Sequence, residues 1–202
     1  MLVHNMSLTE YLSKNGILDL EGHTENVKGQ QEELIKLSKN VKTVMEIGFN
    51  AGHSAELFLK NNPELTLTSF DIGDHNYVLR GKQYIDKMFP GRHTLIIGDS
   101  TVSVPKFIKD HPETNFDLLF IDGCHEYEIA KADLENCKHL AHKDSIFIMD
   151  DTIFSDIGYG QWNIGPTKAV IELHKKGLLI NLKAIDFIPG RGMTIGSYNL
   201  GF

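Results

Sequence analysis

Acidic side chains stand at regular places in this sequence, each at the end of a short run rich in β-branched and aromatic residues. They are Glu46, Asp71, Asp99, Asp122 and the neighbours Asp150 and Asp151. If these runs are parallel strands, their C-terminal ends share the edge where open α/β sheets bind ligands. Carboxylates gathered at one edge repel one another unless a cation lies among them. The alternative for any single acid is capping of the following helix, since Asp is a preferred N-cap residue.

The turn after the first run, residues 46–54, has the sequence EIGFNAGHS. A dinucleotide-binding turn has glycine at the middle position of G-x-G-x-x-G, so that the backbone can approach a pyrophosphate. Asn50 stands at that position here, and the Glu46 carboxylate would lie close to the phosphates. The turn therefore favours a positively charged, phosphate-free nucleoside such as S-adenosylmethionine, with Gly48 and Gly52 keeping the turn tight.

Two further sites suit the sugar and the base of such a nucleoside. Asp71 follows the glycine turn by about twenty residues, which is where an acid receives the two hydroxyls of a ribose. Asp99 and Ser100 close the third run and can reach the edge of an adenine. Turn, ribose acid and adenine residues together predict a nucleoside-binding site.

The elements that must position these residues alternate along the chain. Strands are predicted over residues 41–48, 65–71, 93–99, 116–122 and 145–151, and helices over 55–61, 104–111 and 128–140. This alternation predicts an α/β fold with a Rossmann-like, doubly wound, mostly parallel sheet. Residues 1–40 are expected to form a helical cap on the core at 41–202, all within one domain of residues 1–202.

The C-terminal part of the chain has a different pattern. After Gly165-Pro166-Thr167 the sequence predicts one more helix, with Pro near its first turn. Strands over 182–188 and 193–198, joined by Pro-Gly-Arg-Gly, predict an antiparallel hairpin at the edge of the sheet. The stretch 152–165 between these parts is expected to be a loop.

Composition excludes some partners and compartments. The 202 residues have a formal net charge of −7 at pH 7, and no cluster of Lys and Arg interrupts this acidity. Neither nucleic acid nor a membrane is therefore expected as a partner. Cys124 and Cys137 have neither metal-finger nor redox spacing and are expected to be reduced thiols. The N-terminus lacks a signal-peptide pattern, so a cytoplasmic protein is expected.

Several of these segments resemble class I S-adenosylmethionine-dependent methyltransferases. The matching segments are residues 45–59, 69–75, 96–100, 116–135 and 146–152. They are most similar to the branch that contains catechol and caffeoyl-CoA O-methyltransferases and related small-molecule and sugar O-methyltransferases. The pattern I-D-G-x-H-x-Y at residues 121–127, with the later D-D-T at 150–152, is the most specific part of the resemblance.

The resemblance implies roles for the residues at the strand ends. Residues matching Glu46, Gly48 and Gly52 lie against the cofactor, and those matching Asn50 and Ser54 lie along its methionine part. An acid matching Asp71 holds the ribose, and residues matching Asp99 and Ser100 flank the adenine. Asp122 is expected to contact both the cofactor and a metal ion.

The metal-dependent relatives bind Mg²⁺ with an acid matching Asp122 and an Asp-Asn pair after the fifth strand. This chain has Asp150 and Asp151 there, and carboxylates are hard oxygen ligands suited to Mg²⁺, Mn²⁺ or Ca²⁺. His125 stands where the catechol and caffeoyl-CoA enzymes have a lysine, as in the sugar-modifying relatives. A histidine titrates near neutrality, so His125 is the predicted base that accepts the acceptor's hydroxyl proton.

The acceptor is expected to be a small hydroxylated molecule that binds near the loop at 152–165. Phe154, Tyr159 and Trp162 in this loop could form a lid, or they could pack the loop onto the domain. The resemblance also suggests a homodimer.

Three rival functions stay open at this point. An NAD-dependent oxidoreductase shares the sheet architecture, although Asn50 counts against it. A non-catalytic S-adenosylmethionine-binding module would keep the pocket without turnover. A metal-independent methyltransferase would use the same cofactor without the predicted ion.

Overall fold

The computed structural model describes residues 6–22, 26–155 and 160–201. In this part of the chain, seven strands form a single sheet in the order β3-β2-β1-β4-β5-β7-β6. The strands are β1 (Thr43–Ile47), β2 (Thr66–Asp71), β3 (His93–Ile97), β4 (Phe116–Ile121), β5 (Ala141–Asp150), β6 (Leu179–Ile188) and β7 (Arg191–Tyr198). β1 to β5 are parallel, whereas β7 runs antiparallel to both β5 and β6. The predicted fold class is confirmed, including its antiparallel C-terminal hairpin.

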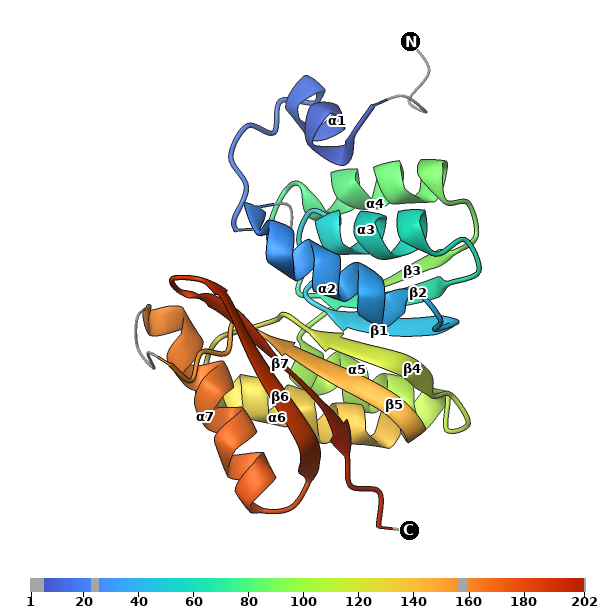
Figure 1. Ribbon diagram of the computed structural model, residues 1–202. Coiled ribbons are helices and arrows are strands. Elements are labelled where there is room, and N and C mark those ends of the chain that lie inside the picture. The colour runs from blue at the N-terminus through green and yellow to red at the C-terminus, as the bar shows by residue number, and fades with distance from the viewer. Residues whose placement is uncertain (1–5, 23–25, 156–159, 202) are drawn as a thin grey trace.

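Helices cover both faces of the sheet, as Figure 1 shows. One face carries α2 (Lys28–Ser38), α3 (His53–Asn61) and α4 (Val78–Met88), and α1 (Leu8–Lys14) packs outside this layer against α4. The other carries α5 (Ser100–Asp110), α6 (Tyr127–Cys137) and α7 (Gln161–Lys175). None of the helices in the described ranges combines the length and the apolar composition needed to cross a bilayer.

Each central strand supplies both cores, because successive side chains of a strand point to opposite faces. On β1, Val44 packs with α2 and α3, and Met45 and Ile47 pack with α5 and α6. On β4, Leu118 and Leu119 divide in the same way. Strands buried on both faces explain the nearly continuous apolar runs in the sequence.

The strand order reverses between β1 and β4. β2 and β3 lie on one side of β1, whereas β4 and β5 lie on the other side. Open α/β sheets form a ligand-binding crevice outside the carboxyl ends of the strands at such a point. The fold therefore places the turn after β1 and the loop after β4 beside the same crevice.

The predicted start of the last helix is wrong. α7 begins at Gln161, so Pro166 lies inside the helix and Trp162 lies in its first turn instead of in a loop. Pro166 is the sixth residue of α7, so its missing N–H costs the helix one hydrogen bond to the Trp162 carbonyl. Close packing favours the longer helix: a Cβ on Gly165 would lie 2.0 Å from the His125 carbonyl oxygen.

The hairpin turn is shorter than predicted. β6 extends to Ile188 and β7 begins at Arg191, which leaves Pro189 and Gly190 as the connection. Gly190 has a φ of 80°, in the left-handed region that favours glycine. Arg191 thus becomes the first residue of a strand next to β5 instead of part of a loop.

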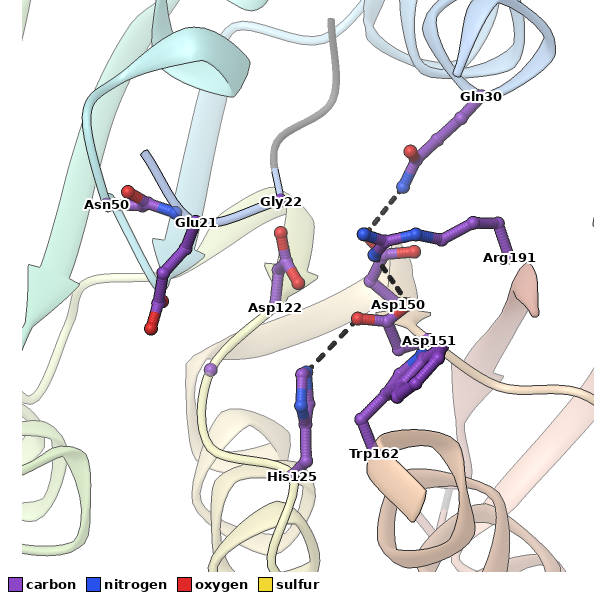
Figure 2. A pocket seen from close by; sticks show the side chains of 11 residues that line it. Glu21, Gly22, Gln30, Asn50, Asp122, His125, Asp150, Asp151, Trp162 and Arg191 are labelled. Atoms are coloured by element: carbon purple, nitrogen blue, oxygen red, sulfur yellow. Dashed lines mark hydrogen bonds and ion pairs between the residues drawn. The ribbon is translucent and has the colours of Figure 1, made fainter. Parts of the chain in front are cut away.

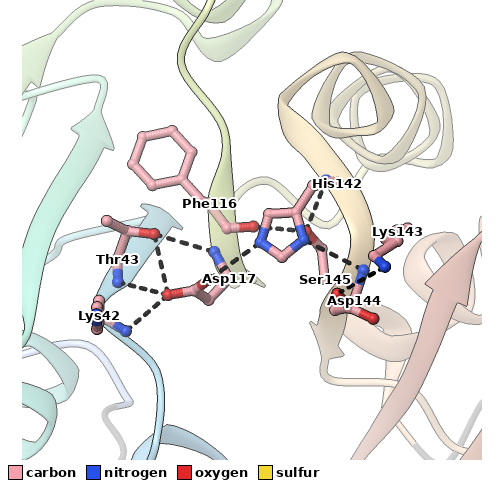
Figure 3. Close-up of polar contacts among 8 residues, drawn as sticks. All are labelled: Lys42, Thr43, Phe116, Asp117, His142, Lys143, Asp144 and Ser145. Atoms are coloured by element: carbon pink, nitrogen blue, oxygen red, sulfur yellow. Dashed lines mark hydrogen bonds and ion pairs between the residues drawn. The ribbon is translucent and has the colours of Figure 1, made fainter.

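Asp117 ties together the N-terminal ends of the strands that carry the crevice (Figure 3). Its Oδ2 accepts the backbone N–H groups of Lys42 at 2.6 Å and of Thr43 at 3.0 Å. Its Oδ1 lies 3.0 Å from His142 Nε2 on β5. Burial by itself raises the pKa of Asp117, but these hydrogen bonds outweigh it and hold the pKa below its usual value.

We predict that Asp117→Asn lowers the free energy of unfolding at pH 7 by about 2 kcal/mol, because charge-assisted hydrogen bonds are lost. An acid with a lowered pKa stabilises the fold above its unfolded pKa, and this contribution is lost as pH falls through the folded value. The difference between wild type and variant should therefore shrink below about pH 4. Urea unfolding at several pH values measures it, with exposed Asp144→Asn as the control. An equal difference at pH 7 and at pH 3 would contradict this role.

Candidate active site

Two cavities open at the carboxyl ends of the parallel strands and adjoin each other. The first, called the Asp71 cavity, has a volume of about 320 Å³ and is lined by Phe70, Asp71, Asp99, Ser100 and Ile129, among others. The second, called the Asp151 cavity, has a volume of about 410 Å³ and is lined by His125, Asp150, Asp151, Trp162 and Arg191, among others. Both are bordered by Glu21, Asn50, Asp122 and Gly123. A molecule in one cavity can therefore touch a molecule in the other.

The turn after β1 forms the wall common to both cavities. Asn50 has a φ of 53°, so it takes the left-handed conformation that a glycine would supply in a dinucleotide-binding turn. Asn is one of the few other residues that tolerate it. Gly48 has a φ of 94°, and a Cβ there would lie 1.9 Å from the Asp122 carbonyl oxygen. Glycine at 48 is thus required for the close approach of the loops after β1 and β4.

Asp71, the last residue of β2, holds the two loops beside it. Its Oδ2 accepts the Asn50 N–H and its Oδ1 accepts the Gly73 N–H, both at 2.7 Å. The carboxylate also lines the Asp71 cavity. This is the position predicted for an acid that receives a ribose.

Glu46 lies behind the cavity wall and lines neither cavity. It is fully buried and accepts hydrogen bonds from the hydroxyls of Ser54 and Ser69. Its place on β1 explains this, because Glu46 points to the same face as Val44, toward α3. Gly52, with a φ of 96°, also lies outside both linings, and there a Cβ would lie 2.7 Å from the Phe49 ring.

Asp99 and Ser100 line the Asp71 cavity at the end of β3. Asp99 is also the N-cap of α5, and its carboxylate accepts the Thr101 N–H at 2.8 Å. Hydrogen bonds from the Thr101 hydroxyl and N–H lower the pKa of Asp99. Asp99 therefore both caps α5 and lines the Asp71 cavity.

The ends of β4 and β5 bring three carboxyl groups together in the Asp151 cavity (Figure 2). Asp122 follows β4, Asp150 ends β5, and Asp151 comes next with a φ of 52°. A positive φ is uncommon for residues other than glycine, although Asp and Asn adopt it more readily than most. It turns the buried Asp151 side chain toward Asp122 and His125.

Both oxygens of Asp151 are occupied by basic side chains. His125 Nε2 lies 3.1 Å from Oδ2, and Arg191 Nη1 lies 3.0 Å from Oδ1. Asp150 has a different partner, since Gln30 of α2 donates a hydrogen bond to its Oδ2 at 2.5 Å. The three predicted metal ligands thus lie together, but Asp150 faces the α2 side and Asp151 faces His125.

Burial and, to a lesser extent, mutual repulsion raise the pKa values of two acids of this cavity. Burial raises the pKa of Asp122 well above its usual value, and repulsion from Asp150 and Asp151 adds to the effect. Burial, together with repulsion from Asp151, also raises the pKa of Asp150 to about 7, although Gln30 and Arg191 oppose the shift. Ionising these carboxyl groups costs free energy, and a further cation beside them would lower that cost.

Asp122, His125 and Asp151 form a donor set that suits a cation. One donor atom from each lies within 4.8 Å of the other two. Two carboxylates and an imidazole suit a divalent ion such as Mn²⁺ as well as Mg²⁺. The raised pKa of Asp122 agrees with this fit, since a bound cation would offset the repulsion.

The aromatic residues of the stretch 152–165 are not all placed at the site. Trp162 lines the Asp151 cavity and is 41% exposed. Phe154, 38% exposed, is absent from the lining of both cavities. Tyr159 lies outside the described residues.

Comparison with known proteins agrees with this geometry. Residues 45–152, more than half of the chain, match a family model described as a methyltransferase domain. The chain belongs to this methyltransferase family. The match covers the turn after β1, the ends of β2 to β5 and the acidic cluster, and it confirms the resemblance to class I S-adenosylmethionine-dependent methyltransferases. Among proteins with curated descriptions, no sequence match is found.

Solved structures of O-methyltransferases share the fold of this methyltransferase. The O-methyltransferase from Bacillus cereus in complex with SAH is 14% identical, with a TM-score of 0.71 over 95% of this chain and 90% of that one. CalS11, a TDP-rhamnose 3'-O-methyltransferase of calicheamicin biosynthesis, is 22% identical, with a TM-score of 0.65 over 100% of this chain and 90% of that one. An O-methyltransferase family protein from Burkholderia thailandensis is 13% identical, with a TM-score of 0.65 over 87% of this chain, which spans 57% of that protein.

Sequence reasoning missed two polar residues of the methyltransferase site. Gln30 and Arg191 lie outside the residues that match the family model, on α2 and at the start of β7. The glycines beside Arg191 suggested only a turn. Residues 21–34 could be expected from the resemblance to form a second lid over the acceptor, but no local pattern singles out Gln30 within them. Both become visible only when the N-terminal helices and the hairpin are folded over the ends of β4 and β5.

The buried carboxyl group of Glu46 gives a test of the packing behind the turn after β1. Burial raises the pKa of Glu46 to about 7, although hydrogen bonds from Ser54 and Ser69 oppose the shift. Because the folded state then binds the proton more tightly than the unfolded state, stability falls as pH rises between about 4.5 and 7. We predict that wild type loses about 3 kcal/mol over this window relative to Glu46→Gln. Urea unfolding measures the difference.

Glu113→Gln, at an exposed position, is the control and should follow wild type at every pH. Parallel curves for wild type and Glu46→Gln would mean that Glu46 is not held in a dry environment.

Proposed function

We propose that this methyltransferase moves the methyl group of S-adenosylmethionine onto a hydroxyl of a small molecule, with the help of a divalent ion. The observation that carries the proposal is the common border of the two cavities at Asn50 and Asp122. A transfer between two molecules requires their reacting atoms to meet in line. Adjoining cavities at the strand ends meet that requirement, with the cofactor in the Asp71 cavity and the acceptor in the Asp151 cavity.

The Asp71 cavity has the chemistry that the nucleoside part of the cofactor needs. Asp71 stands where it can accept the ribose hydroxyls, and Asp99 and Ser100 offer polar atoms to an adenine edge. Phe70 and Ile129 supply apolar lining for the base. Neither Glu46 nor Ser54 lines this cavity, so we assign them to supporting the turn at Asn50 through their mutual hydrogen bond.

The acidic border favours the cofactor over its product. S-adenosylmethionine carries a positive sulfonium, which the carboxylate of Asp122 would attract. When the acceptor oxygen attacks the methyl carbon, the carbon–sulfur bond breaks and its electron pair stays on sulfur, which becomes a neutral thioether. The attraction to Asp122 is then lost, and the product can leave.

We assign the divalent ion to the carboxylates of Asp122 and Asp151, which lie close together, with Asp150, whose Oδ2 is engaged by Gln30, as the third ligand expected from the sequence. When bound, this ion would supply a Lewis acid that lowers the pKa of the acceptor hydroxyl. His125 lies beside the ligands on the acceptor side, and we assign it the role of the base that takes the hydroxyl proton. Asp151 Oδ2, 3.1 Å away, would orient the imidazole.

The proposal extends to the cell compartment and assembly. Cys124 and Cys137 are both free thiols, which agrees with the reducing conditions of the cytoplasm. We also keep the homodimer, and an acceptor other than nucleic acid, as proposals.

We predict that Asp71→Asn weakens the binding of S-adenosylhomocysteine tenfold or more. The substitution removes a carboxylate that accepts two backbone N–H groups and that would accept the ribose hydroxyls. Hydrogen bonds to a charged group contribute about 1.5–3 kcal/mol. Isothermal titration calorimetry measures the dissociation constant. Asp74→Asn, an exposed neighbour, is the matched control and should bind as wild type does. Binding of NAD in place of S-adenosylhomocysteine would replace this function with that of an oxidoreductase.

The metal assignment predicts that EDTA and Asp151→Asn each lower kcat for a hydroxylated acceptor about a hundredfold, since a Lewis acid contributes several kcal/mol to such a step. The affinity for S-adenosylhomocysteine should stay within a few-fold, because Asp151 does not line the Asp71 cavity. Radiolabel transfer measures the rate, with Asp144→Asn as the control. Undiminished transfer in EDTA and in Asp122→Ala would show a metal-independent enzyme.

A further inference from the structure

The basic side chains of the Asp151 cavity already have an anionic partner. His125 and Arg191 contact the two oxygens of the same carboxylate, that of Asp151, at 3.1 and 3.0 Å. Gly22, in the segment before α2, lies against the other side of the guanidinium, because a Cβ there would lie 2.3 Å from Arg191 Nη2. Each basic side chain of the described lining is thus already paired with a carboxylate.

The remaining charges of the cavity repel anions. Glu21, Asp122 and Asp150 line it together with Asp151, so its carboxyl groups outnumber its single guanidinium. When Asp122 and Asp150 carry protons, the two negative charges of Glu21 and Asp151 still exceed the one positive charge of Arg191. When all four carboxyl groups are ionised, their four negative charges exceed the three positive charges of Arg191 and a divalent ion, and a protonated His125 would only balance them.

One wall of the cavity is a flat apolar surface. The Trp162 indole is backed by Gly160, where a Cβ would lie only 2.3–2.5 Å from three atoms of the six-membered ring. The indole N–H points to the Gly190 carbonyl oxygen, 3.4 Å away. Held in this way, a ring that is 41% exposed lies beside Asp151 at the cavity (Figure 2).

We propose that the acceptor is an uncharged or amine-bearing hydroxylated ring that stacks on Trp162, and that phosphorylated or carboxylated rings are excluded. This inference rests on the proposed function and names the substrate class for the same site. An indole face binds sugar and aromatic rings by dispersion and attracts cations through its π-electrons. The carboxylates around it attract an amine and repel an anion.

The test uses the only tryptophan of the chain as its probe. The protein is first saturated with S-adenosylhomocysteine in buffer with Mg²⁺, and Trp162 fluorescence is followed while matched rings are added. One set is a catechol ring with an ethylamine, ethanol or acetate tail. The other set is glucosamine, glucose and glucuronate. We expect the amine and neutral members of at least one set to change the fluorescence and to bind at least about tenfold more tightly than the acid.

Calorimetry on Trp162→Leu supplies the second measurement, since this variant has no fluorescence signal. The binding of the preferred ring should weaken about tenfold, whereas Phe154→Leu, outside the cavity lining, should bind as wild type does. The inference is overturned if the acid binds as tightly as the neutral ring, if Trp162→Leu binds unchanged, or if no ring alters the fluorescence of the loaded protein. Failure to bind S-adenosylhomocysteine at all would instead remove the proposed function itself.

Discussion

Crowded carboxyl groups at the ends of β4 and β5 are the constraint on which the rest of this structure depends. Asp122, Asp150 and Asp151 share a small space, and burial together with mutual repulsion raises the pKa of Asp122 and Asp150. Such a cluster is stable only with compensation. Arg191 and Gln30 supply part of it, each held by an element outside the central parallel strands. A hydrogen bond from α2 and an ion pair from the C-terminal hairpin thus tie both elements to the same edge of the sheet.

This arrangement separates two tasks along that edge. On the β2 and β3 side, Asp71 is satisfied by backbone N–H groups and keeps an ordinary hydrogen-bonding environment. On the β5 side, the carboxyl groups are left short of positive charge. The Asp71 cavity therefore suits neutral polar groups such as ribose hydroxyls, whereas the Asp151 cavity suits cations. Asp122 lies between the two, where a sulfonium and a metal-assisted hydroxyl would meet.

Much of this could be predicted from the sequence, because strand-end acids and apolar runs are local patterns. The parallel strands, the hairpin and the convergence of the acids follow from them. The direction of the Glu46 side chain was not predicted, although the alternation of side chains along β1 would have given it. Val44 and Glu46 point to the same face of the sheet, and Glu46 lines neither cavity. Arg191 and Gln30 could not be predicted, since their contacts with Asp151 and Asp150 span 40 and 120 residues. The start of α7 was missed because Gly165 and Pro166 are local signals for a helix boundary, whereas in the fold both lie buried inside α7.

The most direct test of the central claim is a crystal structure of the protein with S-adenosylhomocysteine and a divalent ion. We expect the ribose on Asp71, the sulfur at the border by Asn50 and Asp122, and the ion between Asp122 and Asp151. A nucleoside bound in the Asp151 cavity, or a sulfur directed away from Asp122, would contradict the division of the site into cofactor and acceptor cavities.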